Sequence, residues 1–216
     1  MTDWELLQAG KVYNDFSDEL FEHRIRAKRL FREYNKSDDS EIQKRNEIMK
    51  ELFGAVGEKV WIEPDFRCEY GSNIFIGNNV YINFGCIILD CARISIGDDV
   101  LFGPNVGLYA ANHAIDAEQR LNGNCSGKPI TIGNRVWLCG DVKIVGGVTI
   151  GDNSVIGAGS VVTKNIPSGV VAAGNPCRVI RKITEADKTV RDRTGQDAVR
   201  DRTEQDAVRD RTGQDA

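Results

Sequence analysis

A polar segment from Ala111 to Lys128 carries the side chains with the clearest potential for chemistry. It contains His113, Arg120 and Cys125, and His113 is one of only two histidines in the chain. An imidazole exchanges a proton near neutral pH, so His113 suits general base catalysis; the alternative is an ordinary surface side chain. Long segments that project from a repetitive scaffold are typically either functional or disordered. His113 is therefore the first candidate for a catalytic group.

The sequence contains few residues that could bind a metal ion. A zinc site of the carbonic anhydrase type needs three imidazoles, whereas the chain offers His23 and His113 alone. None of the six cysteines forms a C-x-x-C pair, so we expect reduced, buried thiols and no bound metal. These cysteines are Cys68, Cys86, Cys91, Cys125, Cys139 and Cys177.

The composition argues against several classes of partner. The chain has 28 Lys and Arg residues against 32 Asp and Glu residues, for a formal net charge of -4. This balance provides no basic surface for nucleic acid or an anionic membrane. The N-terminus lacks the apolar stretch of a signal peptide, and no apolar run is long enough to span a bilayer. We therefore predict a cytoplasmic protein that binds neither nucleic acid nor membranes.

The scaffold that would position these groups is indicated by a six-residue period. Apolar residues recur in six-residue steps, and most are followed by Gly and then Asn or Asp. One unbroken series is Ile132, Leu138, Ile144, Ile150, Ile156 and Val162. Earlier series are Ile76, Ile82, Ile88 and Ile94, and then Ile96, Phe102 and Leu108. The period predicts a coil of short strands in which three units, about 18 residues, make one triangular turn.

This coil also predicts roles for its repeated residues. The recurrent aliphatic side chains would point inward, the glycines would permit the tight corners, and Asn or Asp would bond its own backbone there. Ile96 and Ile132 are separated by a whole number of six-residue steps, so the register should continue across the polar segment. Chemistry must then come from corners, outward side chains and interruptions of the repeat.

The remaining regions divide the chain into three parts. Residues 1–58 are predicted to be helical, with capping-box spacings at Thr2–Glu5 and Ser40–Gln43 and an antiparallel helix pair. Residues 59–184 form the coil, from which 111–128 projects. Residues 185–216 include three near-identical nine-residue units, each with one apolar residue larger than alanine. We expect this tail to be disordered or weakly helical, with no catalytic role.

The helical region and the coil together resemble a known family. The segments that carry the resemblance are Tyr70–Ile74, Tyr81–Phe84, Ala111–His113, Val155–Lys164 and Gly174–Arg181. In order, spacing and content, about residues 3–184 resemble the maltose and galactoside O-acetyltransferases. The resemblance implies a β-dominated fold, the left-handed parallel β-helix with an N-terminal helix pair. It also implies a homotrimer with active sites between subunits, and acetyl transfer from acetyl-CoA to a hydroxyl of a small sugar.

The resemblance assigns roles to individual residues. His113 matches the catalytic base, and Asn83 matches a residue that contacts the acceptor and the tetrahedral centre. Asn83 follows Ile82, where the repeat usually has Gly, although an ordinary corner role stays open. Trp137 matches an aromatic residue beside the site, or else a hydrophobic lid between subunits. The positions that match acceptor contacts in the N-terminal part are Asp15, Arg24 and Glu69. The positions that match cofactor contacts are Gly140, Ala158, Thr163, Lys164, Arg178 and Arg181.

Two positions depart from the galactoside enzymes. Glu69 stands where those enzymes have a serine, and Cys91 stands where they have an aspartate. Both departures leave the acceptor open: an amino sugar, a chitin-type oligosaccharide or an antibiotic hydroxyl are alternatives to a simple sugar. A non-catalytic trimeric scaffold is a further alternative, against which His113, Asn83 and Thr163–Lys164 argue. The family reaction is direct transfer, without an acyl-enzyme.

Overall fold

The computed structural model describes residues 1–188. Residues 1–182 form one compact unit. A second unit begins at Ile183, and its described part contains a short 3-10 helix, η1 (Glu185–Asp187). The nine-residue units of the predicted tail lie outside the described residues.

Three helices precede the coil, and their ends only partly follow the predicted caps. The predicted capping box of the first helix is confirmed, because Thr2 Oγ1 accepts from the Glu5 amide at 3.3 Å and the Glu5 carboxylate accepts from the Thr2 amide at 3.0 Å. The second predicted box is wrong, because Ser40 donates to Asp38 instead and Glu41 occupies the N-cap without a side-chain bond. The helices are α1 (Asp3–Gln8), α2 (Asp18–Lys36) and α3 (Ile42–Leu52).

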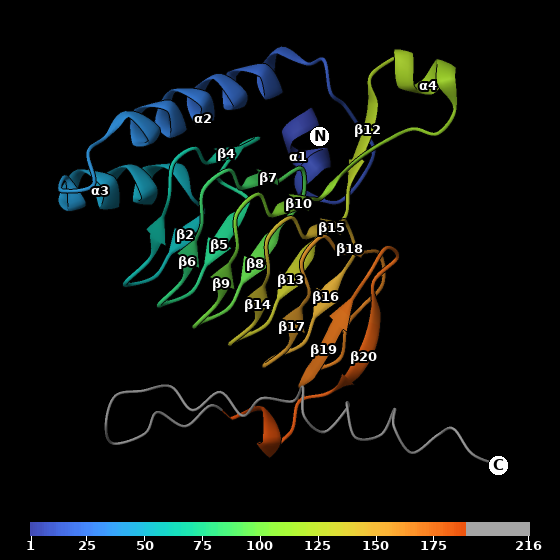
Figure 1. The fold of residues 1–216 in the computed structure, drawn as a ribbon. Helices are drawn as coiled ribbons and strands as arrows, with labels where there is room; N and C mark the ends of the chain where they lie inside the picture. Colours follow the sequence, from blue (N-terminus) through green and yellow to red (C-terminus); the bar gives the residue numbers. More distant parts are fainter. Residues whose placement is uncertain (189–216) are drawn as a thin grey trace. The chain divides into compact units, whose positions relative to one another are not determined.

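Three sheets of short parallel strands form the sides of the predicted coil (Figure 1). The first consists of β4 (Arg67–Cys68), β7 (Ile87–Leu89), β10 (Gly107–Tyr109), β15 (Lys143–Val145) and β18 (Val161–Val162). The second consists of β2 (Ala55–Val56), β5 (Ile74–Ile76), β8 (Ile94–Ile96), β13 (Ile130–Ile132) and β16 (Thr149–Ile150). The third consists of β3 (Trp61–Ile62), β6 (Tyr81–Ile82), β9 (Leu101–Phe102), β14 (Trp137–Leu138), β17 (Val155–Ile156), β19 (Val170–Ala173) and β20 (Arg178–Lys182), of which β20 is antiparallel.

The inward residues are the aliphatic side chains that the period selects. Ile82, Ile88, Leu108 and Ile144 are fully buried in one continuous core. Burying a side chain of this size stabilises a fold by about 1.5–3 kcal/mol relative to exposing it. The stacked aliphatic interior therefore leaves no room for a site inside the coil.

The length of a turn differs from the prediction in a way that locates the site. Ile132 lies beside Ile150, which gives the predicted 18 residues per turn, but Ile76 lies beside Ile96, 20 residues later. Ile96 lies beside Ile132, so the register is kept across the polar segment, as predicted. The extra residues all fall at the corner between the first and second sheets, which we call the insertion edge: residues 69–73, 90–93 and 110–129.

The opposite end of the second sheet shows what the Gly-Asn/Asp pairs do. Asn78 Oδ1 accepts from the Glu58 amide, and Asn134 Oδ1 accepts from the Asp98 amide, each at 2.9 Å. These side chains therefore bond the backbone of the preceding turn, not their own, which corrects the prediction. Gly97 is required for space: a Cβ there would lie 2.5 Å from Asn134 Oδ1. The positive φ of the corner falls on the second residue after the glycine, such as Asp99 (57°).

Candidate active site

The segment that carries His113 is an ordered hairpin. Its strands are β11 (Ala111–His113) and β12 (Asn124–Gly127), joined by α4 (Ala117–Leu121). Arg120 closes the connection, because its Nη1 donates to the carbonyls of Ala114 and Ile115, each at 2.9 Å. In the described chain Arg120 thus has a structural role, and His113 is an exposed side chain on a regular strand at the insertion edge.

The N-terminal region reaches this hairpin through a third strand. β1 (Tyr13–Asn14) pairs antiparallel with β12, so that Tyr13, Cys125 and His113 lie side by side across one small sheet. Cross-strand neighbours point to the same face of a sheet. The sequence alone placed Cys125 only in the same segment as His113, whereas the structure makes it the direct neighbour of His113.

Cys125 is nevertheless poorly suited to nucleophilic attack. Its side chain is buried, accepts from the Tyr13 hydroxyl at 3.2 Å and donates to the Asn112 carbonyl at 3.2 Å. Burial raises the pKa of the Cys125 thiol. Since the thiolate is the nucleophilic form, this environment disfavours a cysteine-based acyl-enzyme.

Three of the residues predicted to bind an acceptor come together beside this hairpin. Arg24 of α2 donates from Nε to Glu69 Oε1 at 2.6 Å, from Nη1 to the Asp15 carbonyl at 2.9 Å, and from Nη2 to Asp15 Oδ1. Nη2 also reaches the Tyr70 hydroxyl at 3.0 Å. Burial lowers the pKa of Arg24, but Tyr70, Asp15 and Glu69 outweigh it, so the pKa is raised overall and Arg24 stays charged. We call Asp15, Arg24 and Glu69 the ionic cluster.

The ionic cluster is linked to the hairpin by the backbone. The Asp15 amide donates to the Gly123 carbonyl at 2.8 Å, two residues before Cys125, the neighbour of His113. The side chains of Asp15 and Glu69 are 21% and 26% exposed, so a small molecule in front of the hairpin has access to them.

Asp90 supports the corner that carries Glu69. It is fully buried, and its carboxylate accepts from the amides of Glu69 (3.0 Å), Tyr70 (2.8 Å) and Asn73 (3.2 Å). Burial raises the pKa of Asp90 to about 6, although backbone donors that include Tyr70 and Asn73 lower it. The only sequence feature that marks Asp90 is that it follows a strand without the usual Gly. This feature indicates an enlarged corner, but it does not predict which amides Asp90 accepts from.

Cys91 occupies a buried position behind the ionic cluster. It is 5% exposed and packs with Tyr13, Tyr70 and Cys125. Burial raises the pKa of its thiol. All six cysteines are free thiols, as predicted, and five of them are buried.

The other predicted residues of the coil lie on a different edge. Asn83, Gly140 and Ala158 all occupy the corner between the third and first sheets; Gly140 and Ala158 are on successive levels of the coil, and Asn83 is two levels before Gly140. The Asn83 side-chain oxygen accepts from the Phe84 amide at 2.9 Å, as an ordinary corner residue would. Trp137, on the outer side of β14, is 50% exposed. A single chain therefore does not bring these residues to His113.

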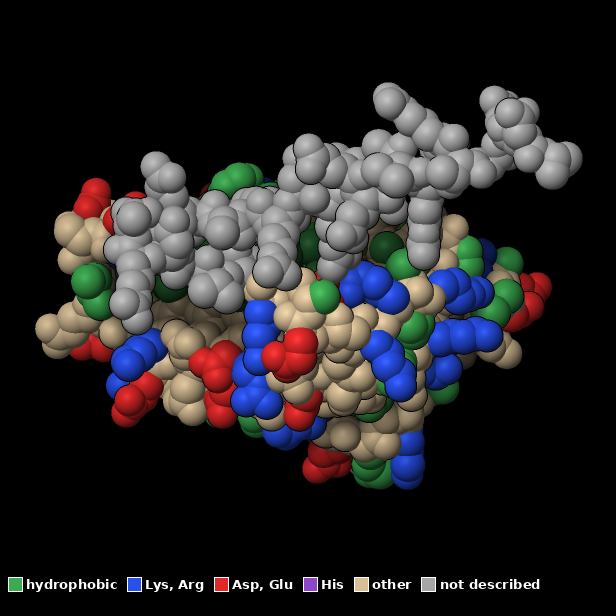
Figure 2. Space-filling model, turned by 60° about the horizontal axis from the view of Figure 1, so that its bottom comes forward, with side chains coloured by type: hydrophobic (Ala, Val, Ile, Leu, Met, Phe, Trp, Pro, Cys, Tyr) green, Lys and Arg blue, Asp and Glu red, His purple; other side chains and the backbone are tan. Residues whose placement is uncertain are grey.

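The predicted phosphate-binding residues lie toward the C-terminal end of the coil. Thr163 and Lys164 follow β18 at the insertion edge, and Arg178 and Arg181 project from β20. All four are exposed. Figure 2, which turns the bottom of Figure 1 toward the viewer, shows Lys and Arg side chains gathered on this face.

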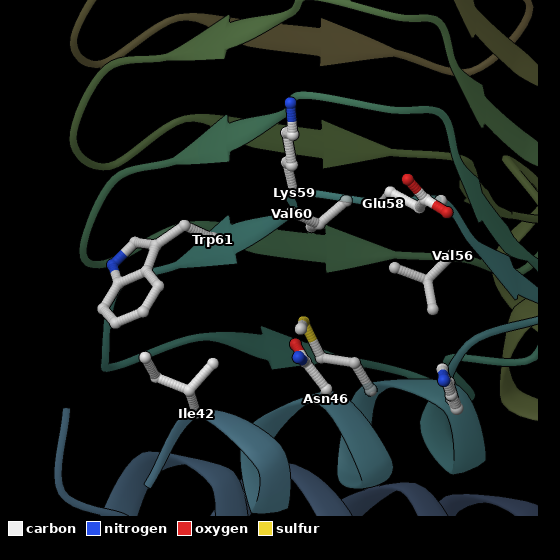
Figure 3. A pocket seen from close by; sticks show the side chains of 10 residues that line it. Ile42, Asn46, Val56, Glu58, Lys59, Val60 and Trp61 are labelled. Atoms are coloured by element: carbon white, nitrogen blue, oxygen red, sulfur yellow. The ribbon is translucent and has the colours of Figure 1, made fainter. Parts of the chain in front are cut away.

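Other features of the described residues carry little chemistry. Within residues 1–188, no three His, Cys, Asp or Glu side chains are close enough together to hold a metal ion. His23 stacks on Trp4 with ring centroids 4.0 Å apart, which accounts for it structurally. A hollow between α3 and the first turn of the coil is lined by Ile42, Asn46, Val56 and Trp61, among others, and contains none of the predicted site residues (Figure 3). No helix of the described chain has the length and hydropathy needed to cross a bilayer.

Comparison with known proteins places this geometry in a family. Residues 7–57 match the family model described as maltose acetyltransferase hexapeptide capping motif, and residues 129–164 match bacterial transferase hexapeptide (six repeats). The chain is 53% identical to the galactoside O-acetyltransferase of Escherichia coli K12 over 184 residues, which is 85% of this chain and 91% of that protein.

Two solved structures agree with this assignment. A maltose O-acetyltransferase from Clostridium difficile 630 superposes with a TM-score of 0.83 at 49% identity, covering 86% of this chain and 99% of that one. A galactoside acetyltransferase in complex with coenzyme A also has a TM-score of 0.83, at 52% identity, covering 88% and 95%. The chain belongs to the maltose and galactoside O-acetyltransferase family. It is therefore an acyltransferase of the hexapeptide-repeat class with the left-handed parallel β-helix fold, as the resemblance implied.

Proposed function

We propose that the protein transfers the acetyl group of acetyl-CoA directly to a hydroxyl of a small sugar, with His113 as the general base. The imidazole takes the proton from the sugar hydroxyl while the hydroxyl oxygen bonds to the thioester carbonyl carbon. The tetrahedral centre then collapses, the C–S bond breaks, and the thiolate of CoA leaves and takes up a proton. Positioned base catalysis of this kind contributes about 10²–10⁴-fold to the rate.

One observation carries this proposal. His113, an exposed imidazole, lies on the small three-stranded sheet whose strand β1 leads directly into Asp15 of the partly exposed ionic cluster. The first group can accept a proton, and the second can accept hydrogen bonds from sugar hydroxyls. The identity of 53% with a galactoside O-acetyltransferase supports a sugar acceptor.

We further propose that the active site is completed in a homotrimer. Asn83, Gly140 and Ala158 stand on one edge of the coil, and His113 stands on another. Both sets can contribute to one site if the edge of one chain faces the edge of its neighbour. Exposed apolar side chains support this arrangement, since Phe84 (54%), Leu101 (50%) and Trp137 (50%) lie on or beside the Asn83 edge. Such exposure is typical of an interface between copies.

On this proposal, acetyl-CoA lies between two coils. Gly140 and Ala158 would act through their backbone along the pantetheine arm, where small side chains allow close approach. The Gly140 N–H is a candidate for stabilising the oxyanion. Thr163, Lys164, Arg178 and Arg181 would hold the phosphates, for which arginine has a suitable two-pronged geometry.

An acceptor panel tests the proposal. Purified protein is incubated with acetyl-CoA and with glucosides, galactosides, maltose, amino sugars, chitin oligosaccharides and antibiotic hydroxyl acceptors, while free thiol release is followed. We expect saturable thiol release with at least one simple sugar and an O-acetylated product by mass spectrometry. Thiol release with none of these acceptors would contradict the proposal, and exclusive use of an amino sugar or antibiotic would reassign the acceptor.

A further inference from the structure

The hydrogen bonds of Arg24 decide what the ionic cluster can offer to an acceptor. A guanidinium has five N–H groups. Four of them are taken by Glu69 Oε1, the Asp15 carbonyl, Asp15 Oδ1 and the Tyr70 hydroxyl. The Arg24 side chain is only 13% exposed. Arg24 is thus nearly saturated by the protein itself and cannot present a bidentate fork to an anion.

The two carboxylates are less fully used. Among the described residues, Glu69 Oε2 and Asp15 Oδ2 have no hydrogen-bond partner, and both side chains are more exposed than Arg24. An ionised carboxylate only accepts hydrogen bonds. Two carboxylates and one guanidinium also leave the cluster with an excess negative charge. A ligand therefore encounters acceptors and negative charge here.

We infer that Glu69 is a specificity-determining residue that selects acceptors with hydroxyl or ammonium donors and rejects sugars carrying a carboxylate or phosphate at this end. Arg24 is then a positioning residue: it fixes the two carboxylates and does not bind the acceptor itself. This inference rests on the proposed function. Asp90 holds the Glu69 amide from behind, so the carboxylate is presented from a fixed corner.

One opposing influence lies nearby. Glu69 also borders a hollow between α2 and the first sheet, which is lined by exposed cations: Lys28, Arg32, Lys36 and Arg67. If these cations governed recognition, anionic sugars would be favoured. Exposed charges are screened by solvent and salt, whereas the cluster is mostly buried. We therefore expect the cluster to dominate.

The test uses three glycosides that differ only at carbon 6: methyl glucoside, methyl glucuronide and methyl 6-amino-6-deoxyglucoside. Calorimetric binding in the presence of CoA and kcat/KM with acetyl-CoA are both measured. We expect the glucuronide to be poorer than the glucoside by about tenfold or more, through KM, and the ammonium compound to be equal or better. A glucuronide that binds as well as the glucoside would overturn the inference, as would the absence of binding by all three.

Two variants test whether the discrimination against the glucuronide depends on the charge of Glu69. Glu69→Gln keeps the shape of the side chain and removes its charge, and should reduce the discrimination against the glucuronide about tenfold. Glu33→Gln removes an exposed carboxylate from the outer side of α2 and should leave it unchanged. Equal discrimination in wild type and Glu69→Gln would overturn the inference. Selective binding without acetylation would contradict the proposed function alone, and acetylation without selectivity would contradict this inference alone.

Discussion

Asp90 gives a prediction that links the fold to the acceptor site. Its buried carboxylate accepts three backbone amides from the corner 69–73, which carries Glu69. Burial raises its pKa from 3.8 to about 6. Asp90→Asn removes the ionisation and keeps the size of the side chain.

The magnitude follows from the two pKa values. The folded protein binds this proton more tightly than the unfolded chain, so the stability contributed by Asp90 is complete below about pH 4 and is lost as the pH rises through about 6. A difference of about two units, at 1.36 kcal/mol each, corresponds to about 3 kcal/mol. Asp90→Asn loses hydrogen bonds at every pH but should not show this loss with rising pH. Relative to wild type, the variant should therefore gain about 2 to 3 kcal/mol between pH 4 and pH 7.

Hydrogen exchange measures this effect at the place where it arises. Exchange of the Glu69 and Tyr70 amides, corrected for intrinsic rates, is compared for wild type and Asp90→Asn across this pH range, together with urea unfolding. The difference between the two proteins cancels the other ionisable groups. The same pH dependence of stability in both proteins would refute the argument, and so would a relative gain toward low pH.

Three further predictions concern the scaffold, the cofactor and the thiol. Gly97→Ala places a Cβ 2.5 Å from Asn134 Oδ1 and should lower the free energy of unfolding by about 2 kcal/mol, measured in urea. An unchanged urea midpoint would contradict the requirement for space between Gly97 and Asn134. Arg181→Ala should raise KM for acetyl-CoA about tenfold with little change in kcat, since it removes binding shared by the ground and transition states; no change in KM would exclude Arg181 from the cofactor site. Cys125→Ser should keep kcat within about twofold, because the buried thiol is not the nucleophile; abolished turnover, or acetyl-enzyme formed without acceptor, would require a cysteine mechanism instead.

The coil could be predicted from the sequence because each inward position repeats the same physical requirement. The inward position of each unit must be apolar, and the step from Ile96 to Ile132 preserves the register across 36 residues, although the 20-residue turns interrupt the six-residue step. The helices could also be placed, since α2 and α3 carry apolar residues at helical spacing. The cap at Ser40 could not, because a Ser-x-x-Gln spacing does not reveal that the Ser40 hydroxyl donates to Asp38, or that Glu41 takes the N-cap position and accepts from the Asp38 amide.

The candidate site was less accessible to sequence reasoning. The pairing of Tyr13 with Cys125 joins residues 112 positions apart, and no local pattern predicts it. The pairs of Arg24 with Asp15 and Glu69 were suggested residue by residue through the family, but not their mutual hydrogen bonds. The site residues are divided between two edges of the coil. This could not be predicted without the structure, because the structure shows which corner each residue occupies. That division is the physical reason to expect a site shared between copies of the chain.

One comparison of turnover tests whether His113 serves as the base in direct acetyl transfer. Wild type, His113→Ala and His23→Phe, which keeps the stack on Trp4, are assayed with acetyl-CoA and the best acceptor of the panel. CoA affinity is measured on the same samples. We predict that His113→Ala loses about two to four orders of magnitude in kcat with nearly unchanged CoA affinity, while His23→Phe stays active. A His113→Ala enzyme that retains kcat within tenfold of wild type would contradict the account.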